Sequence, residues 1–508
     1  MKLNIAYTKI LTEWNTLLDQ MGVLYSLIDW QKDLLTEYAV IIVNSVLNNE
    51  EGNKIREFVD KGGSLLIEAN YSKRIFRINT KNIFIKYLFS KGKVFSNYFP
   101  LIDLYRNCTV PANANLLKDQ EGRFVVSEMK WEKGNVIIIP GNFISAVSEV
   151  KVLRKRIYSN GKIPSERVSR VSKGSIHHFL KTALEHLFHQ RDLPFVSLWN
   201  FPGKTKNIFL FRIDTDYGSQ GQVDNLYKTL NEKEIKGTWF VETKSAESWI
   251  NKYTSFQNQE IALHCYRHRL FNTFAENFSN YNKGLEVLKK ASIYPKGVAA
   301  PFGEWNDSFN KVVEKLDFEY SSEFSYCYDS FPQFAGYILQ IPIHPISFGR
   351  LSREGYTAEE MYDYFINVIN QKIALCEPVI IYTHPKEERL EILKRIFNYI
   401  NQLELPKYTF KEYSDWWRKR SKAKFNSSFI NNELKFETEN EDNFLWLKVV
   451  YPSKEIYLMP LSENNSEKIK IKLPEFQYDS EFNPEALRKY DFSLLKDDIL
   501  FEMRKRKL

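Results

Sequence analysis

The sequence predicts an α/β protein with three domains: a parallel-sheet domain, a (β/α) barrel and a small antiparallel β domain. Strand-like and helix-like stretches alternate over residues 1–150 and again over 206–420, which is the pattern of parallel sheets covered by helices. From residue 425 to 508 the apolar period changes to two, as in antiparallel strands with one buried face. The 508 residues are enough for about three domains of ordinary size, each with its own core.

Residues 1–150 are expected to form a parallel sheet with helices on both faces. Strand and helix patterns alternate over 3–6, 8–21, 23–28, 39–43, 49–61 and 64–69. A hairpin is expected to close the domain over 124–139. The stretch Ala39–Asn70 resembles the flavodoxin-like sheet of class I glutamine amidotransferases, which carry a Cys on the elbow after the strand. Here the elbow, 68–72, has no Cys, so glutaminase activity is not expected.

Residues 151–205 are expected to form a basic surface linker, followed by a helix over 175–190. That helix contains four histidines: His177, His178, His186 and His189. His177 and His178 are adjacent and point apart on a helix, while His178 and His186 lack the four-residue spacing of a ligand pair. We therefore interpret these histidines as structural.

Two short motifs organise the next domain. An apolar run over 208–213 predicts a strand that ends in Asp214-Thr215-Asp216, so two carboxylates are expected at the mouth of a barrel. His264 and His268 are four residues apart, which on a helical turn places both imidazoles on one face. With Asp216 they would form a facial set of metal ligands that leaves positions open for water and substrate. Each motif alone also fits a simpler interpretation, a solvated turn or two partly buried histidines.

The motifs together resemble the NodB-homology polysaccharide deacetylases, which have the fold of the family 4 carbohydrate esterases. Four motifs of that family match in order: 212–216 (Arg-Ile-Asp-Thr-Asp), 264–268 (the two histidines), 299–303 (Ala-Ala-Pro-Phe-Gly) and 380–385 (Ile-Ile-Tyr-Thr-His-Pro). The stretch 236–241 also resembles the second strand of the family. The resemblance covers about Lys206 to Trp417 and implies a distorted (β/α) barrel.

The resemblance implies a metal-dependent hydrolase that removes an acyl group, most simply acetyl, from an N-acylated amino sugar in a polysaccharide or its precursor. The implied ligands of one divalent ion are Asp216, His264 and His268. Zinc is the first choice for this ion, with cobalt or nickel as alternatives. Asp214 would be the general base that takes a proton from the attacking water, and His384 the general acid that protonates the departing amine.

The resemblance also implies substrate contacts. Pro301, Phe302 and Gly303 follow a predicted strand, where a groove wall is expected. The backbone N–H of Tyr217 would help to hold the oxyanion. His344 lies at another strand end, where it could bind substrate or orient a catalytic group, and a satisfied loop histidine is an equally good interpretation.

Two departures from the family pattern stand out. Ala299 takes the place of an Arg that steadies the catalytic Asp, and Arg212 or Arg267 is the candidate to replace it. The family's Asp/Trp motif, which supplies an acid to tune the catalytic His, has two candidate counterparts, 320–324 and 328–329.

The last domain, over 425–508, is expected to form strands over 433–437, 444–450, 455–459 and 468–473. Trp446 or Tyr457 could bind sugar there, but a packing module or a homo-oligomer interface is the simpler interpretation. Two functions of other classes stay open for the whole chain: hydrolysis of a non-sugar C–N amide bond, and a carbohydrate-binding scaffold without turnover. The presence of both Asp214 and His384 argues against a scaffold, because neither is needed to hold a metal.

Composition narrows the partners and the compartment. The net charge of +8 is spread over basic clusters that no nucleic-acid motif accompanies, so we expect no nucleic-acid partner. The four cysteines form no C-x-x-C pair, so neither a disulfide framework nor a thiolate zinc site is expected. The N-terminus has a strand pattern rather than that of a signal peptide, and no stretch has the length of a transmembrane helix. We therefore expect a cytoplasmic protein.

Overall fold

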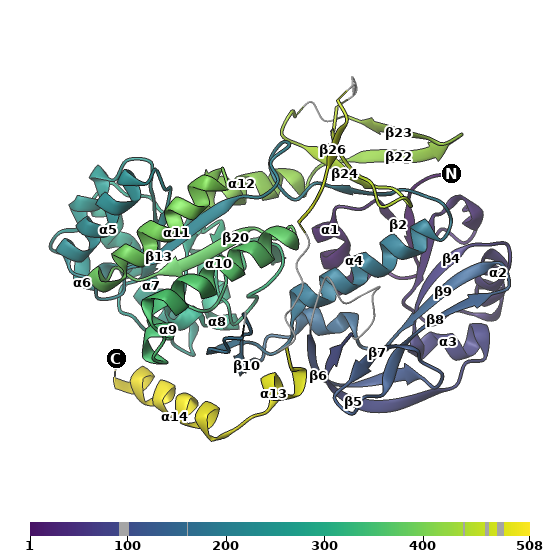
Figure 1. Cartoon of the computed structure of the whole chain (residues 1–508), viewed down its shortest axis with the longest axis horizontal. Coiled ribbons are helices and arrows are strands. Elements are labelled where there is room, and N and C mark those ends of the chain that lie inside the picture. The colour runs from purple at the N-terminus through teal and green to yellow at the C-terminus, as the bar shows by residue number, and fades with distance from the viewer. Residues whose placement is uncertain (91–100, 160, 440–441, 463–466, 475–481, 508) are drawn as a thin grey trace. The chain divides into compact units, whose positions relative to one another are not determined.

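The computed structural model describes residues 1–90, 101–159, 161–439, 442–462, 467–474 and 482–507 (Figure 1). The chain divides into two compact units. Unit 1 comprises 1–149, 171–204 and 419–475, and unit 2 comprises 150–170, 205–418 and 476–508. Within the described part of the chain, no helix combines the length and the apolar character needed to cross a bilayer. Cytoplasmic location and homo-oligomerisation stay predictions.

Unit 1 is built on a nine-stranded sheet in the order β2-β1-β3-β4-β9-β8-β7-β5-β6. Its strands are β1 (Ile5–Tyr7), β2 (Tyr25–Leu27), β3 (Val40–Val43), β4 (Ser64–Glu68), β5 (Thr80–Phe89), β6 (Ile102–Pro111), β7 (Leu116–Asp119), β8 (Phe124–Trp131) and β9 (Gly134–Ile139). The neighbours among β2, β1, β3, β4 and β9 pair in parallel, and the remaining strands add antiparallel pairs. The predicted parallel sheet and the hairpin over 124–139 are therefore confirmed, whereas the flavodoxin-like resemblance stays a prediction.

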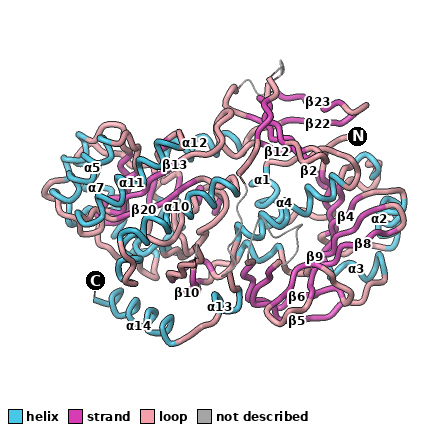
Figure 2. The backbone as a smooth tube through the Cα atoms, viewed as in Figure 1, coloured by secondary structure: helices cyan, strands magenta, loops and turns pink. Residues whose placement is uncertain are grey.

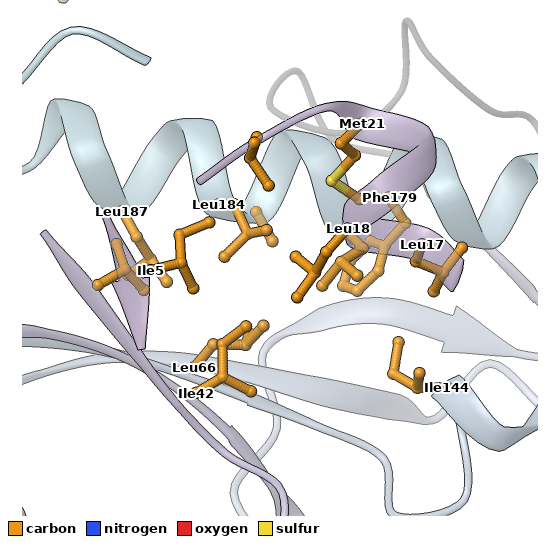
Figure 3. Packing of buried hydrophobic residues seen from close by; sticks show 14 of the residues in the cluster. Ile5, Leu17, Leu18, Met21, Ile42, Leu66, Ile144, Phe179, Leu184 and Leu187 are labelled. Carbon is orange, nitrogen blue, oxygen red and sulfur yellow. The ribbon is translucent and has the colours of Figure 1, made fainter. Parts of the chain in front are cut away.

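Helices cover both faces of this sheet because alternate strand residues are apolar on both sides. Helices α1 (Thr12–Met21) and α4 (Lys173–His189) pack on the face that includes Ile5, Ile42 and Leu66 (Figure 3). Helices α2 (Asn49–Asp60) and α3 (Ala69–Phe76) pack on the other face. Two short 3₁₀ helices complete this part, η1 (Leu35–Glu37) and η2 (Ile144–Ser148).

The expected C-terminal β domain is not one body. Strands β24 (Trp446–Val450), β25 (Ile456–Pro460) and β26 (Ile469–Ile471) form an antiparallel sheet whose first strand is β12 (Phe195–Leu198), and β22 (Phe425–Ile430) pairs with β23 (Glu433–Thr438). These strands belong to unit 1. Trp446 is buried on β24, as a packing residue would be.

The sheet of unit 2 runs in the order β18-β19-β17-β16-β15-β14-β13-β20, and β21 also pairs with β13. Its strands are β13 (Phe209–Asp214), β14 (Thr238–Glu242), β15 (Glu260–Cys265), β16 (Gly297–Val298), β17 (Tyr320–Ser321), β18 (Gln333–Ala335), β19 (Ile338–Gln340), β20 (Val379–Thr383) and β21 (Lys407–Tyr408). All neighbours pair in parallel except β18 and β19. The sheet is a curled half-barrel, so the predicted α/β class holds.

Helices follow most of these strands: α5 (Gln220–Glu232), α6 (Thr243–Ala246), η3 (Ile250–Ser255), α7 (Phe274–Lys290), η4 (Pro301–Gly303), α8 (Asp307–Lys315), α9 (Phe348–Arg353), α10 (Ala358–Ala374), η5 (Glu387–Arg389), α11 (Leu390–Gln402) and α12 (Phe410–Arg420). Several start at side-chain caps; Ser219 and Gln222, for example, form a capping box at α5. An irregular segment, 341–347, follows β19 and lies beside β20. There the N–H of His344 donates to the carbonyl of Ile380, and the Tyr382 hydroxyl donates to the carbonyl of Pro345.

Two flanking segments of unit 2 differ from expectation. Residues expected to form a linker instead form an antiparallel pair, β10 (Val152–Arg156) with β11 (Ser165–Ser169). The end of the chain, where strands were expected, forms two helices, α13 (Pro484–Arg488) and α14 (Phe492–Lys507) (Figure 2). The basic run on β10 suggested a solvated loop, but Arg154 and Lys155 are almost fully buried there in polar contacts.

Two glycines of unit 2 allow a matched test of the packing. A Cβ at Gly297 on β16 would lie 1.9 Å from the ring of Tyr320, whereas a Cβ at Gly221 on α5 meets nothing within 4 Å. We expect Gly297→Ala to lower the free energy of unfolding by about 1–3 kcal/mol because the ring must move. Gly221→Ala should raise it by about 0.5–1 kcal/mol. Urea unfolding measures both, and equal effects would contradict this packing.

Candidate active site

The end of β13 carries both predicted carboxylates. Phe209, Phe211 and Ile213 pack against the helices, so the alternate positions, including Asp214, face the inside of the half-barrel. Asp216 follows in the left-handed region with a φ of 42°, a conformation that non-glycine residues adopt mainly where the surroundings hold it. The N–H of Glu242 donates to the Thr215 hydroxyl and holds the intervening loop.

The two predicted histidines meet Asp216, but not on a helix as we expected. His264 is on β15 and His268 lies in the turn just after it, because the chain bends at the strand end. The Nε2 atoms of His264 and His268 lie 3.4 Å and 3.2 Å from Asp216 Oδ1. Nδ1 of His264 lies 2.8 Å from the carbonyl oxygen of Ala299, which can only accept, so Nδ1 carries the proton and Nε2 presents its lone pair.

This cluster fits a divalent metal ion. Asp216 Oδ1 and His264 Nε2 are buried and make no hydrogen bond within the described residues. One ligand atom from each of Asp216, His264 and His268 lies within 4.8 Å of the others. Nitrogen and oxygen ligands about 2.0–2.1 Å from a tetrahedral ion are about 3.3 Å apart, close to the two separations from Asp216 Oδ1. Two imidazoles and one carboxylate are also the ligand types of catalytic zinc sites.

His384 completes the polar end of the site. It follows β20, and its Nε2 lies 3.2 Å from Asp216 Oδ2, the carboxylate oxygen that the other histidines do not contact. Burial lowers the pKa of the His384 imidazole, against the attraction of Asp216 and Asp214. Burial would raise the pKa of the Asp216 carboxyl, but the charges of His384 and His268 hold it well below its usual value.

Ala299 lies where the resembled family has an arginine, and here Arg212 contacts Asp214 instead. Arg212 is fully buried two residues before Asp214 on the same strand, and their contact is bidentate, with Nε–Oδ1 at 2.6 Å and Nη2–Oδ2 at 2.8 Å. Its third nitrogen, Nη1, donates to the carbonyl of Ser322. Burial would lower the pKa of Arg212, but the Asp214 charge raises it above the usual value. Of the two candidates that the sequence offered, Arg212 is therefore the partner of Asp214.

Glu323, a candidate partner of His384, lies elsewhere in the network. Its carboxylate accepts hydrogen bonds from the Ser321 hydroxyl and the N–H of Ala300, and the charge of Arg212 acts on it. Burial raises the pKa of this carboxyl to about 7 despite those contacts. Ala299, the residue before Ala300, provides the carbonyl that orients His264. Glu323 therefore contacts the segment that follows β16 and does not contact His384 through any of these hydrogen bonds.

The site opens into a cavity of about 880 Å³. Asp214, Asp216, His264, His268 and His384 line it. Of the predicted substrate contacts, Tyr217, Phe302 and Gly303 line the cavity as well, whereas Pro301 and His344 are not among its lining residues. His344 is buried with its Nε2 3.0 Å from the Tyr364 hydroxyl, and burial lowers its pKa to about 3. These contacts favour the interpretation of His344 as a buried histidine whose hydrogen-bond partner lies within the fold.

Sequence reasoning missed two walls of this cavity. One is the β10–β11 pair, which contributes Arg154 and Glu166, and the other is α14, which contributes Asp497 and Phe501. Both lie outside the stretch that carries the motifs. The sequence did contain one indication of this contact. Three acidic residues of the last helix, 497, 498 and 502, have a charge opposite to that of the basic residues on β10 and β11.

Comparison with known proteins agrees with this geometry. Residues 206–321 match the sequence model of a family described as polysaccharide deacetylase. No curated protein sequence matches the chain. Residues 206–321 are therefore similar to polysaccharide deacetylases, and members of family 4 of the carbohydrate esterases are among the structural neighbours of the chain.

Three solved structures illustrate the neighbours. A family 4 carbohydrate esterase from Streptomyces lividans in complex with acetate is 16% identical, with a TM-score of 0.30, over 41% of this chain and 92% of its own. A pseudoenzyme of that family from Bacillus anthracis is 16% identical, with a TM-score of 0.32, over 42% of this chain and 66% of its own. An allantoinase is 15% identical, with a TM-score of 0.36, over 43% and 93%. Function therefore has to be inferred from the site itself.

The Arg212–Asp214 pair allows a test by double mutation. We expect Arg212→Met or Asp214→Leu alone to lower the free energy of unfolding by about 3–5 kcal/mol, because each leaves one buried charge unpaired. The double variant should recover most of that loss. Urea unfolding of all four proteins measures the coupling. A double variant that loses the sum of the two single effects would show that the charges do not interact.

The metal cluster predicts a loss of binding on removal of one ligand. Wild-type protein should purify with one divalent ion, and saturation at about 100 times the dissociation constant should stabilise it by about 2.7 kcal/mol. His264→Ala should lose both the ion and the stabilisation. His186→Ala, which removes a histidine paired with Glu128 in unit 1, is the control and should keep both. Elemental analysis and thermal unfolding provide the measurements. Equal metal content in the two variants would exclude this cluster.

Proposed function

We propose that the chain is a metal-dependent hydrolase that removes the acetyl group from an N-acetylated amino sugar. The observation that carries this proposal is the position of Asp214 beside the Asp216, His264 and His268 cluster, in one cavity with His384. The polysaccharide deacetylase match over 206–321 supports the same class of reaction. A scaffold that only binds metal or sugar has no use for a second carboxylate held by a dedicated arginine.

Each polar group has a task in amide hydrolysis. A divalent ion held by the cluster would polarise the acetyl carbonyl and lower the pKa of water to about 7. The Asp214 carboxylate accepts the proton of the attacking water, and the two hydrogen bonds from Arg212 hold that carboxylate in a fixed orientation. His384 gives a proton to the departing amine. Because burial lowers its pKa, the charged donor form of His384 is favoured towards acid pH.

The apolar lining supports a sugar as the substrate. Tyr217, Phe302 and Phe324 line the cavity, and aromatic rings of this kind contact the apolar faces of small ligands. The backbone N–H of Tyr217, next to Asp216, is the candidate donor to the oxyanion. Phe302 has a φ of 61°, in the left-handed region, which is a further sign of a segment held for function.

A variant of the proposed base tests the reaction. Purified protein should release acetate from N-acetylated amino sugars when zinc, cobalt or nickel is added. Asp214→Asn should lower the rate by about 10²–10⁴-fold, because it removes the proton acceptor while its side chain still receives a hydrogen bond from Arg212. Metal content should stay unchanged. Asp415→Asn, which changes an exposed carboxylate paired with Lys411, is the matched control.

The same assay separates the alternatives. Release of a product from non-sugar amides, with no acetate from acetylated saccharides, would assign the site to another C–N bond. Unchanged acetate release by Asp214→Asn would remove Asp214 from the mechanism. No turnover of any amide by metal-loaded protein would retire the hydrolase proposal.

A further inference from the structure

Helix α14 turns three acidic side chains toward unit 2, whereas a surface helix on a globular protein usually turns its apolar side to the core. Its acids face unit 2: Asp497 pairs with Arg350, Asp498 with Arg154 and Glu502 with Arg167. Apolar contacts accompany these pairs: Leu494 is buried, and the ring of Phe501 lies 5.4 Å from that of Phe302. Among the described residues, ion pairs are thus a main link between the helix and unit 2.

The opposite side of α14 is an apolar stripe in solvent. Phe492 is 78% exposed, Leu495 43%, Ile499 53% and Met503 50%. Their spacings of three, four and four residues place them in one row along the helix. Single exposed apolar side chains are normal on a protein, but a contiguous row of four marks an interaction site.

The charges near this stripe indicate the kind of partner. Lys496 on α14 is exposed, and the last turn of the helix has the basic sequence 504–507, in which Lys505 pairs with Glu304 of unit 2. The three acids of the helix are the ones paired with arginines of unit 2. An apolar row on a helix whose sequence has five basic residues, 496 and 504–507, against three paired acids suits the surface of an anionic bilayer. There apolar side chains enter the boundary between headgroups and acyl chains, and the bases attract the lipid charge.

We propose that α14 binds the surface of an anionic lipid bilayer through Phe492, Leu495, Ile499 and Met503. The other side of the same helix lines the cavity of the candidate active site. Binding would therefore bring that cavity next to the lipid surface. This inference does not depend on the proposed function; together, the two would direct hydrolysis towards a substrate held at a membrane.

Sedimentation of the full chain with lipid vesicles tests the proposal. The protein should bind vesicles that contain phosphatidylglycerol in phosphatidylcholine, and added salt should weaken that binding. Ile499→Asp should lower the partition coefficient by at least about tenfold, because it removes a buried apolar side chain and adds a negative charge. Ile10→Asp changes an isoleucine of unit 1 with a similar exposure, 59%, and should have no effect. The double change Arg506→Gln and Lys507→Gln should weaken binding by about fivefold per charge.

Three outcomes would overturn the proposal. Wild-type protein could fail to sediment with the anionic vesicles, or Ile499→Asp and Ile10→Asp could bind them equally well. A dimer in the absence of vesicles that Ile499→Asp disrupts would assign the stripe to a second copy of the chain. Acetate release from a soluble acetylated sugar and thermal unfolding, both measured in parallel, show whether each variant is folded. They also keep failure of the enzyme assay separate from failure of vesicle binding.

Discussion

The buried pair of Arg212 and Asp214 is the interaction on which the arrangement of the candidate site depends. The Asp214 side chain is buried, and a buried charge is costly unless an opposite charge and hydrogen bonds compensate for it. The fork of Arg212 satisfies both oxygens of this carboxylate and fixes the plane of the group. Because the arginine precedes the aspartate by two positions on one strand, the two side chains face the same side without any help from a neighbouring strand.

The same pair links the proposed base to the candidate metal ligands. Arg212 also donates to the carbonyl of Ser322, and the next residue, Glu323, receives the N–H of Ala300. The carbonyl of Ala299 in turn fixes the tautomer of His264. Asp214, Arg212, Glu323 and His264 thus belong to one chain of contacts that runs through the backbone of 299–300 and 322. In a cavity of low polarity such a network is rigid when every member has a partner, which keeps the reacting groups in fixed positions.

Much of the site could be predicted from sequence, because its residues lie in motifs at strand ends of a regular α/β pattern. The cluster of Asp216, His264 and His268 was identified in this way, although the histidines use a strand and a turn rather than a helix. The sequence left two candidate partners for Asp214, Arg212 and Arg267, and only the structure shows that the partner is Arg212. Residues 150–170 and α14 were misjudged for a physical reason: their charged side chains suggest solvent, whereas in the fold they neutralise one another in buried pairs.

The way in which α14 is held has a consequence for motion. Three ion pairs join it to unit 2, and Leu494 and Phe501 are among the described apolar side chains on its inner side. The strands beneath the site, β13 and β20, are buried throughout. Displacement of this single helix would therefore widen the cavity without disturbing the sheet beneath the site.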